Sequence, residues 1–99
     1  MSDADIRLHD ANHAEVSGEL TFSTAPALLE RSAVLTSASG TLIVDLQGVT
    51  RADSAGLALL VEWLRLAGAA GHEIQYVELP EQLSRLIRVS GLEQVFALE

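Results

Sequence analysis

Residues 41–67, TLIVDLQGVTRADSAGLALLVEWLRLA, decide the fold of this chain. The run over 42–46 is short and aliphatic, which is typical of a buried strand. A loop is expected over 47–52. Asp53 and Ser54 are both residue types that cap helix N-termini, and the long apolar stretch behind them predicts a helix. Because a helix N-terminus carries a partial positive charge, this cap favours an anion, or a hydroxyl that later becomes anionic.

The residues before this stretch predict a hairpin and a helix. Apolar and polar residues alternate over 6–9 and again over 14–20, so we expect two strands joined by a turn at 10–13. A helix is expected from Ser23 or Thr24 to about residue 36. Pro26 falls in its first turn, where the missing N–H does no harm.

The second half of the chain predicts one more strand, over 74–79, and a last helix from Pro80 to Gly91. Residues 95–98 form either a short edge strand or an apolar tail on the core. We therefore expect an α/β fold with a mixed sheet of four or five strands, in which parallel β-α-β units follow the N-terminal hairpin. Right-handed crossovers place the helices mainly on one face of that sheet. All 99 residues are expected to form a single domain.

Composition narrows the possible functions. The net charge is −8, which argues against nucleic-acid binding and against direct adsorption to anionic lipid. The absence of cysteine excludes disulfide and thiolate chemistry and agrees with a cytosolic location. The first ten residues lack a signal-peptide pattern, and the apolar run over 57–66 is too short to span a bilayer. A partner protein with a basic surface is compatible with this charge.

The helix after Ser54 is apolar over more than half of its circumference. At 100° per residue, one face is expected to meet the sheet, and it consists of Leu57, Leu60, Trp63, Leu64 and Ala67. A flank beyond Trp63 is also apolar and consists of Ala55, Leu59 and Leu66. Such a flank either packs against the last helix or forms a contact surface for a partner. Both alternatives remain open from the sequence.

The motifs of common catalytic and cofactor sites are absent. His9, His13 and His72 lack the spacing of a zinc site, and there is no Gly-x-Ser-x-Gly nucleophile motif. The single glycine of the central turn does not make a phosphate-binding loop. Asp45 and Asp53 are more simply explained as a ligand of loop amides and a helix cap than as paired catalytic carboxylates. We expect no enzyme activity, no cofactor and no metal.

The central stretch resembles the signature of the STAS family. The resemblance rests on Val44-Asp45-Leu46, on the segment Asp53-Ser54-Ala55-Gly56-Leu57 and on Leu59-Leu60, and it extends over nearly the whole chain. STAS domains include anti-sigma-factor antagonists, the tails of anion transporters and a small subunit of the Mla-type phospholipid ABC transporter. The resemblance implies the STAS fold and action through protein partners.

The residues around Gly56 distinguish two versions of this signature. In the anti-sigma antagonists the pattern resembles Asp-Ser-Ser-Gly, and the serine directly before the glycine receives a phosphate. Ala55 occupies that position here. The Mla-type subunits instead resemble Asp-Thr/Ser-small-Gly, with an important hydroxyl two positions before the glycine, which corresponds to Ser54.

The resemblance therefore implies a non-enzymatic cytoplasmic subunit that binds the ATPase subunit of a phospholipid ABC transporter and is held at the inner membrane through it. The alternative is an anti-sigma-factor antagonist under the control of a kinase, with Ser54 as a displaced phosphorylation site. For either partner the candidate contact residues are Asp53, Ser54, Ala55, Leu59, Glu62, Trp63 and Leu66. Arg85 and Arg88 on the last helix are expected to be solvated.

Overall fold

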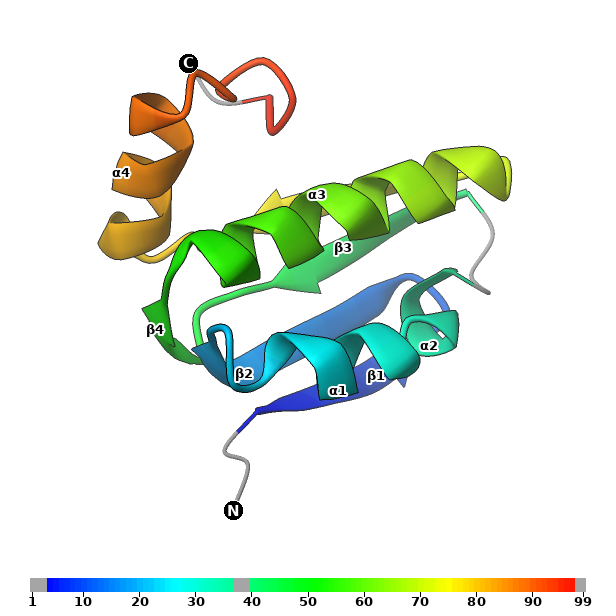
Figure 1. The fold of residues 1–99 in the computed structure, drawn as a ribbon. Coiled ribbons are helices and arrows are strands. Elements are labelled where there is room, and N and C mark those ends of the chain that lie inside the picture. The colour runs from blue at the N-terminus through cyan, green and yellow to red at the C-terminus, as the bar shows by residue number, and fades with distance from the viewer. Residues whose placement is uncertain (1–3, 37–39, 98–99) are drawn as a thin grey trace.

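Five strands form one mixed sheet in the computed structural model of this protein, which describes residues 4–36 and 40–97. The first pair, β1 (Asp5–Asp10) and β2 (His13–Leu20), is the expected antiparallel hairpin. β3 (Thr41–Asp45) runs parallel to β2, and β5 (Glu73–Val77) runs parallel to β3. The order β1-β2-β3-β5 places β1 and β5 at the two edges (Figure 1).

The loop expected over 47–52 is wrong in its last four residues, because β4 (Val49–Ala52) pairs in parallel with the end of β2. The eight residues of β2 thus take two short partners in succession, β3 along its first half and β4 along its last residues. β4 is hidden in the sequence because both of its end residues are buried and both of its middle residues are exposed. That pattern does not have the period of two that marks a strand.

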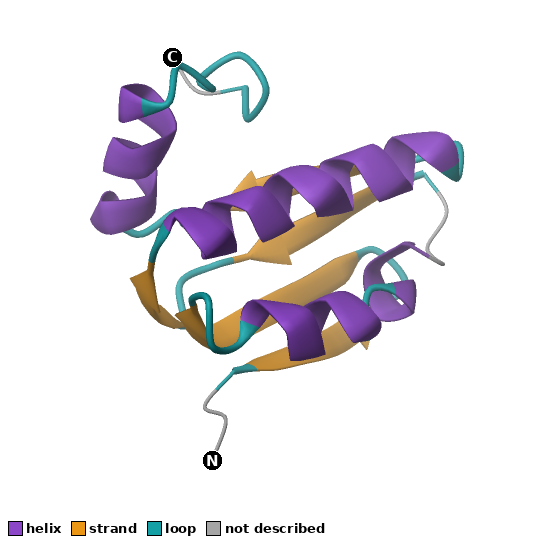
Figure 2. Ribbon diagram, in the orientation of Figure 1, coloured by secondary structure: helices purple, strands orange, loops and turns teal. Residues whose placement is uncertain are grey.

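Helices cover one face of the sheet (Figure 2). They are α1 (Ala25–Glu30), α2 (Ala33–Thr36), α3 (Ser54–Ala69) and α4 (Glu81–Val89). α1, α2 and α3 lie over the strands, and α4 stands beyond the start of α3, near β4. The expected α/β architecture with one-sided helix cover is confirmed, and no helix in the described ranges is long and apolar enough to cross a membrane.

The single helix expected over 24–36 is divided into α1 and α2. Ser32 lies in the break, and its hydroxyl donates to the Leu29 carbonyl at 2.6 Å, a local bond of the kind that competes with the helical backbone. The same oxygen accepts a hydrogen bond from the Trp63 indole at 2.8 Å, which fixes the break against α3. The polar residues expected to end this helix at 37–39 lie outside the described residues.

The core lies between α3 and the inward face of the strands. Its largest fully buried side chain is Trp63. The Tyr76 hydroxyl donates to the Leu60 carbonyl at 2.8 Å and joins β5 to α3. After α4 the chain returns as an apolar tail, in which Phe96 packs on Tyr76 with ring centroids 5.8 Å apart. Of the two alternatives for this segment, the packed tail is the one observed over 95–97, and Leu98 lies outside the described residues.

Candidate functional site

Asp53 organises the start of α3. One oxygen of its carboxylate accepts hydrogen bonds from the backbone N–H groups of Ala55 at 2.9 Å and Gly56 at 3.1 Å, which is the geometry of a helix N-cap. The other oxygen accepts from the backbone N–H of Phe22 at 3.1 Å. The expected cap is therefore confirmed, and the same side chain also anchors the loop between β2 and α1.

The surroundings of Asp53 favour its ionised form. Partial burial raises the pKa of this carboxyl, but the three N–H donors from Phe22, Gly56 and Ala55, together with the nearby charge of Arg51, outweigh that effect. The pKa of Asp53 consequently lies below its ordinary value. The carboxylate is thus charged at neutral pH, and it occupies the donors of the helix terminus that an incoming anion would otherwise use.

Gly56 allows α3 to lie against the end of β2. A Cβ atom at this position would lie 2.0 Å from the carbonyl oxygen of Leu20 and 2.7 Å from its carbonyl carbon. The backbone N–H of Asp53 donates to the same Leu20 carbonyl oxygen at 3.1 Å. Only a residue without a side chain fits between the helix and this strand, so the glycine of the signature is explained by packing.

Ser54 is the first residue of α3 and does not cap it. Its side chain is exposed, and the hydroxyl makes no hydrogen bond to another residue in the described part of the chain. The structural role considered for Ser54, an N-cap, is wrong because Asp53 holds that position. Ala55, which follows, is half-buried.

An open hollow of about 510 Å³ lies between α1 and the first two turns of α3. We call it the α1–α3 groove. Phe22, Ala25, Pro26 and Leu29 line it on one side, and Ala55, Ala58, Leu59 and Glu62 line it on the other. Phe22 is 81% exposed and Leu29 is 44% exposed, so large apolar side chains face the solvent beside the helix start. Exposed apolar surface of this kind is typical of interaction sites.

Five of the seven predicted contact residues lie at the helix start or in the groove. Asp53 and Ser54 lie at the start of α3, and Ala55, Leu59 and Glu62 line the adjoining groove. Leu59 exposes only 4% of its surface to solvent, so it lies at the floor of the groove. Glu62 is half-buried and pairs with Arg65 at 2.6 Å, which lowers the pKa of the glutamate.

Trp63 and Leu66 do not lie on this surface. Trp63 is fully buried against the break between α1 and α2, and its place in the contact set is therefore wrong. Leu66 is half-buried, packs on the core and does not line the groove. Of the two alternatives for the flank, packing on the last helix is not observed at Leu59, since α1 and its preceding loop form the other wall there.

Sequence reasoning missed the wall formed by Phe22, Pro26 and Leu29. Leu29 lies in α1 close to the break at Ser32, and its side chain is 44% exposed. The sequence does offer a sign that Phe22 is functional, because it is a lone aromatic residue between a strand and a helix start in a chain with only two phenylalanines. Its position beside Asp53 depends on a contact across 31 residues, which no local pattern reveals.

The other candidate groups are Asp45, Arg85 and Arg88. Asp45 accepts a hydrogen bond from the Gln47 backbone N–H at 2.7 Å, as expected for a ligand of loop amides. Arg85 and Arg88 are exposed, and Arg85 pairs with Glu81 within α4. Within residues 4–36 and 40–97, no group of three His, Asp or Glu side chains is placed to hold a metal ion.

The fold and the capped helix start define a STAS-type domain, and comparison with known proteins agrees. The family model described as "Mlab, STAS domain" matches residues 6–98, and the chain belongs to this family of STAS domains. The anti-sigma-B factor antagonist of Bacillus subtilis is 29% identical over 80 residues, which cover 81% of this chain and 73% of that protein.

Solved structures show the same fold. An anti-sigma factor antagonist from Mycobacterium paratuberculosis is 28% identical with a TM-score of 0.70, and the match covers 96% of this chain and 82% of that one. The murine Slc26a9 anion transporter is 21% identical with a TM-score of 0.67 over 88% of this chain. This chain spans only 15% of that transporter. It also matches a solved structure of Mglu at 25% identity with a TM-score of 0.61, and it spans 20% of that chain.

Proposed function

We propose that this chain is a non-enzymatic STAS domain that binds a protein partner through the α1–α3 groove and the adjoining start of α3. The observation that carries the proposal is the exposed side chain of Phe22, a residue whose backbone N–H is bonded to Asp53 at the helix cap. A large apolar side chain that is exposed to solvent gains free energy when a partner covers it. The family supports this proposal, since the relatives named anti-sigma factor antagonists act on another protein.

The first candidate partner is the ATPase subunit of a phospholipid ABC transporter. It is supported by the order Asp53-Ser54-Ala55-Gly56, which resembles the transporter version of the signature. The name of the matching family model points the same way. In this role Ser54 is a contact residue, because its hydroxyl is exposed and unpaired among the described residues. The domain then acts in the cytoplasm, at the inner membrane, through its partner.

The second candidate role is that of an anti-sigma-factor antagonist. The relatives from Bacillus subtilis and Mycobacterium paratuberculosis favour it. Ala55 has no hydroxyl to receive a phosphate, so this role requires the neighbouring Ser54 as the acceptor. Ser54 is accessible to a kinase because its side chain is exposed.

One experiment separates the two roles. The tagged chain is co-expressed in turn with the transporter ATPase subunit and with an anti-sigma kinase from the same genome, and each complex is purified. The transporter role predicts stable co-purification with the ATPase and no added phosphate on Ser54 by mass spectrometry. Co-purification with the kinase, together with an ATP-dependent phosphate that is lost in Ser54→Ala, would establish the second role and reject the first. If neither protein binds, the proposal of either partner is wrong.

A further inference from the structure

The strand β5 forms an edge of the sheet, with β3 on one side and no strand from the described ranges on the other. The Glu73 backbone N–H donates to the Gly40 carbonyl, and the Val77 carbonyl accepts from the Leu46 N–H, so both residues direct their backbone groups toward β3. Because these groups alternate along a strand, the N–H and C=O groups of Ile74 and Tyr76 face outward. Such groups are a template for one more strand.

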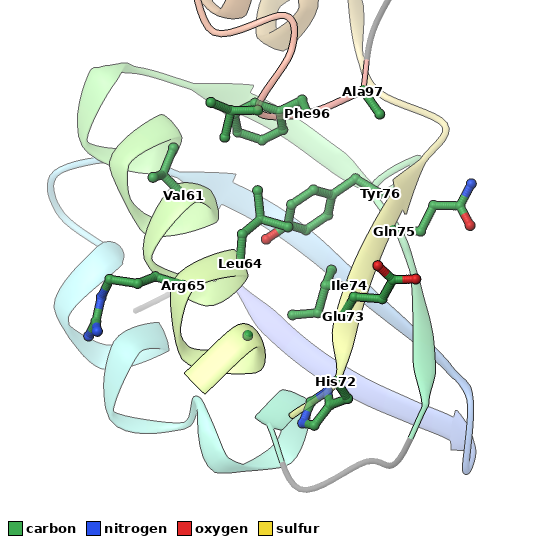
Figure 3. Close-up of a pocket in the computed structure, with 12 residues that line it drawn as sticks. Val61, Leu64, Arg65, His72, Glu73, Ile74, Gln75, Tyr76, Phe96 and Ala97 are labelled. Carbon is green, nitrogen blue, oxygen red and sulfur yellow. The ribbon is translucent and has the colours of Figure 1, made fainter. Parts of the chain in front are cut away.

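A second groove lies between this edge and α3, and we call it the β5-edge groove (Figure 3). Its volume is about 700 Å³, and its apolar lining comes from Val61 and Leu64 on α3, Ile74 and Tyr76 on β5, and Phe96 in the tail. Figure 3 shows the side chains of Ile74 and Tyr76 directed from the strand toward the helix, with Gln75 and Glu73 on the other side. Free backbone groups and an apolar hollow therefore adjoin each other.

The other edge of the sheet, β1, is protected against pairing with a further strand, and β5 is not. β1 carries charges at Asp5, Arg7 and Asp10, and its pairing with β2 is irregular between Leu8 and Asp10. Charged side chains and bulges on an edge strand prevent further pairing. β5 has a single charged residue, Glu73, and regular pairing along its whole length.

The charges around the β5 edge are acidic. Glu73 begins the strand and Glu78 directly follows it, and both are exposed. The nearby cation, Arg65, is already bound by Glu62 through two hydrogen bonds of 2.9 and 2.6 Å. A segment with basic residues at its ends complements this edge. A second copy of the chain does not, because it brings the same glutamates and a net charge of −8.

We propose that the β5 edge binds an extended segment of a partner protein, with alternating apolar residues and a basic residue at each end. The segment adds to the sheet as a new strand, in the mode known as β-augmentation. Its backbone pairs with Ile74 and Tyr76, and its apolar side chains enter the β5-edge groove. The site is separate from the α1–α3 groove, so one STAS domain can hold two protein segments at once.

The test uses a library of acetylated and amidated heptapeptides, Lys-φ-Thr-φ-Thr-φ-Lys, where φ is Val, Ile, Leu or Phe. Each is titrated into the full ¹⁵N-labelled chain and followed by NMR. The tightest member should shift the amide signals of Ile74 and Tyr76. N-methylation of alternate peptide bonds, which removes the donors facing β5, should weaken binding by about tenfold or more.

Matched variants of the chain sharpen the test. Glu78→Lys should weaken binding about two- to fivefold, whereas Glu30→Lys, an exposed change on α1, should leave it unaltered. Phe22→Glu should also bind the peptide normally. The proposal is overturned if no member binds below about 1 mM, or if the shifts fall on Phe22 and Ala58. It is likewise overturned if Ile74 and Tyr76 shift when the protein alone is concentrated, since a second copy is then the occupant.

Discussion

Asp53 and Phe22 are joined by a hydrogen bond of 3.1 Å from the Phe22 backbone N–H to the carboxylate that also caps α3. One side chain thus binds both the start of the helix and the backbone of the residue that carries the exposed aromatic ring. The cap and the proposed docking surface are therefore coupled, and a change at Asp53 is expected to affect stability and partner binding together.

Asp53→Asn tests the contribution of the Phe22 hydrogen bond to stability. An asparagine oxygen can still cap α3, but its NH₂ group cannot accept the hydrogen bond from Phe22. We expect a loss of about 1–2 kcal/mol in the free energy of unfolding. Urea titration followed by the fluorescence of Trp63, the only tryptophan, measures it. A variant as stable as the wild type would show that the Phe22 bond contributes nothing.

The acid stability of the domain depends on the same carboxylate. The pKa of Asp53 is lowered in the folded state, so its contribution is fully present above the ordinary value of 3.8 and is lost as the pH falls through the lower folded value. Wild-type stability should therefore fall more steeply than that of Asp53→Asn below about pH 3.8. Urea midpoints at several pH values between 2.5 and 6, roughly the range where carboxylates titrate, provide the comparison. Parallel curves for the two proteins would contradict the assignment.

Gly56→Ala should disrupt the packing of α3 on β2. The new methyl group would lie 2.0 Å from the Leu20 carbonyl oxygen, so helix or strand must move, and we expect a loss of about 3 kcal/mol or more. Gly68→Ala is the matched control in the same helix, because beyond its own helix backbone and chain neighbours nothing lies within 4 Å of its new Cβ. That change should stabilise the domain by up to about 1 kcal/mol. Similar melting temperatures for the two variants would refute the packing explanation.

Ser32→Ala should leave the Trp63 indole N–H buried without a partner. The expected loss is about 1–3 kcal/mol, the usual consequence of an unsatisfied buried donor. Ser23→Ala, an exposed change in the loop before α1, is the control and should have little effect. Thermal unfolding by circular dichroism measures both variants, and an unchanged Ser32→Ala protein would mean that the hydrogen bond is dispensable.

The sequence predicts the local elements better than their contacts. The hairpin, the strand over 42–46 and the cap at Asp53 follow from alternation, aliphatic content and capping chemistry, which act over a few residues. β4 does not, because its pairing with β2 joins residues about 30 positions apart and its burial pattern has no period of two. Long-range pairing of this kind overrides local preference.

The same limit applies to the site. The helical period correctly marks an apolar flank at Ala55 and Leu59, but it cannot say which element lies opposite. α1 and the loop before it place Leu29 and Phe22 opposite this flank, and Trp63 is buried with its indole bonded to Ser32. Leu59→Glu tests whether this flank is a free surface. We expect the variant to unfold the domain as Leu60→Glu does, because both leucines are buried.

Phe22→Glu tests whether the partner binds at the α1–α3 groove. The side chain is 81% exposed, so the variant should fold normally by circular dichroism, yet a charge in the centre of a covered interface costs several kcal/mol. Val89→Glu on α4 is the matched control, because Val89 is apolar and 87% exposed but lies outside the α1–α3 groove. In titration calorimetry against the partner that co-purifies with the wild type, we expect Phe22→Glu to weaken binding by about a hundredfold or more and Val89→Glu to leave it unchanged. A folded Phe22→Glu protein that binds with wild-type affinity would contradict the account and place the interface elsewhere.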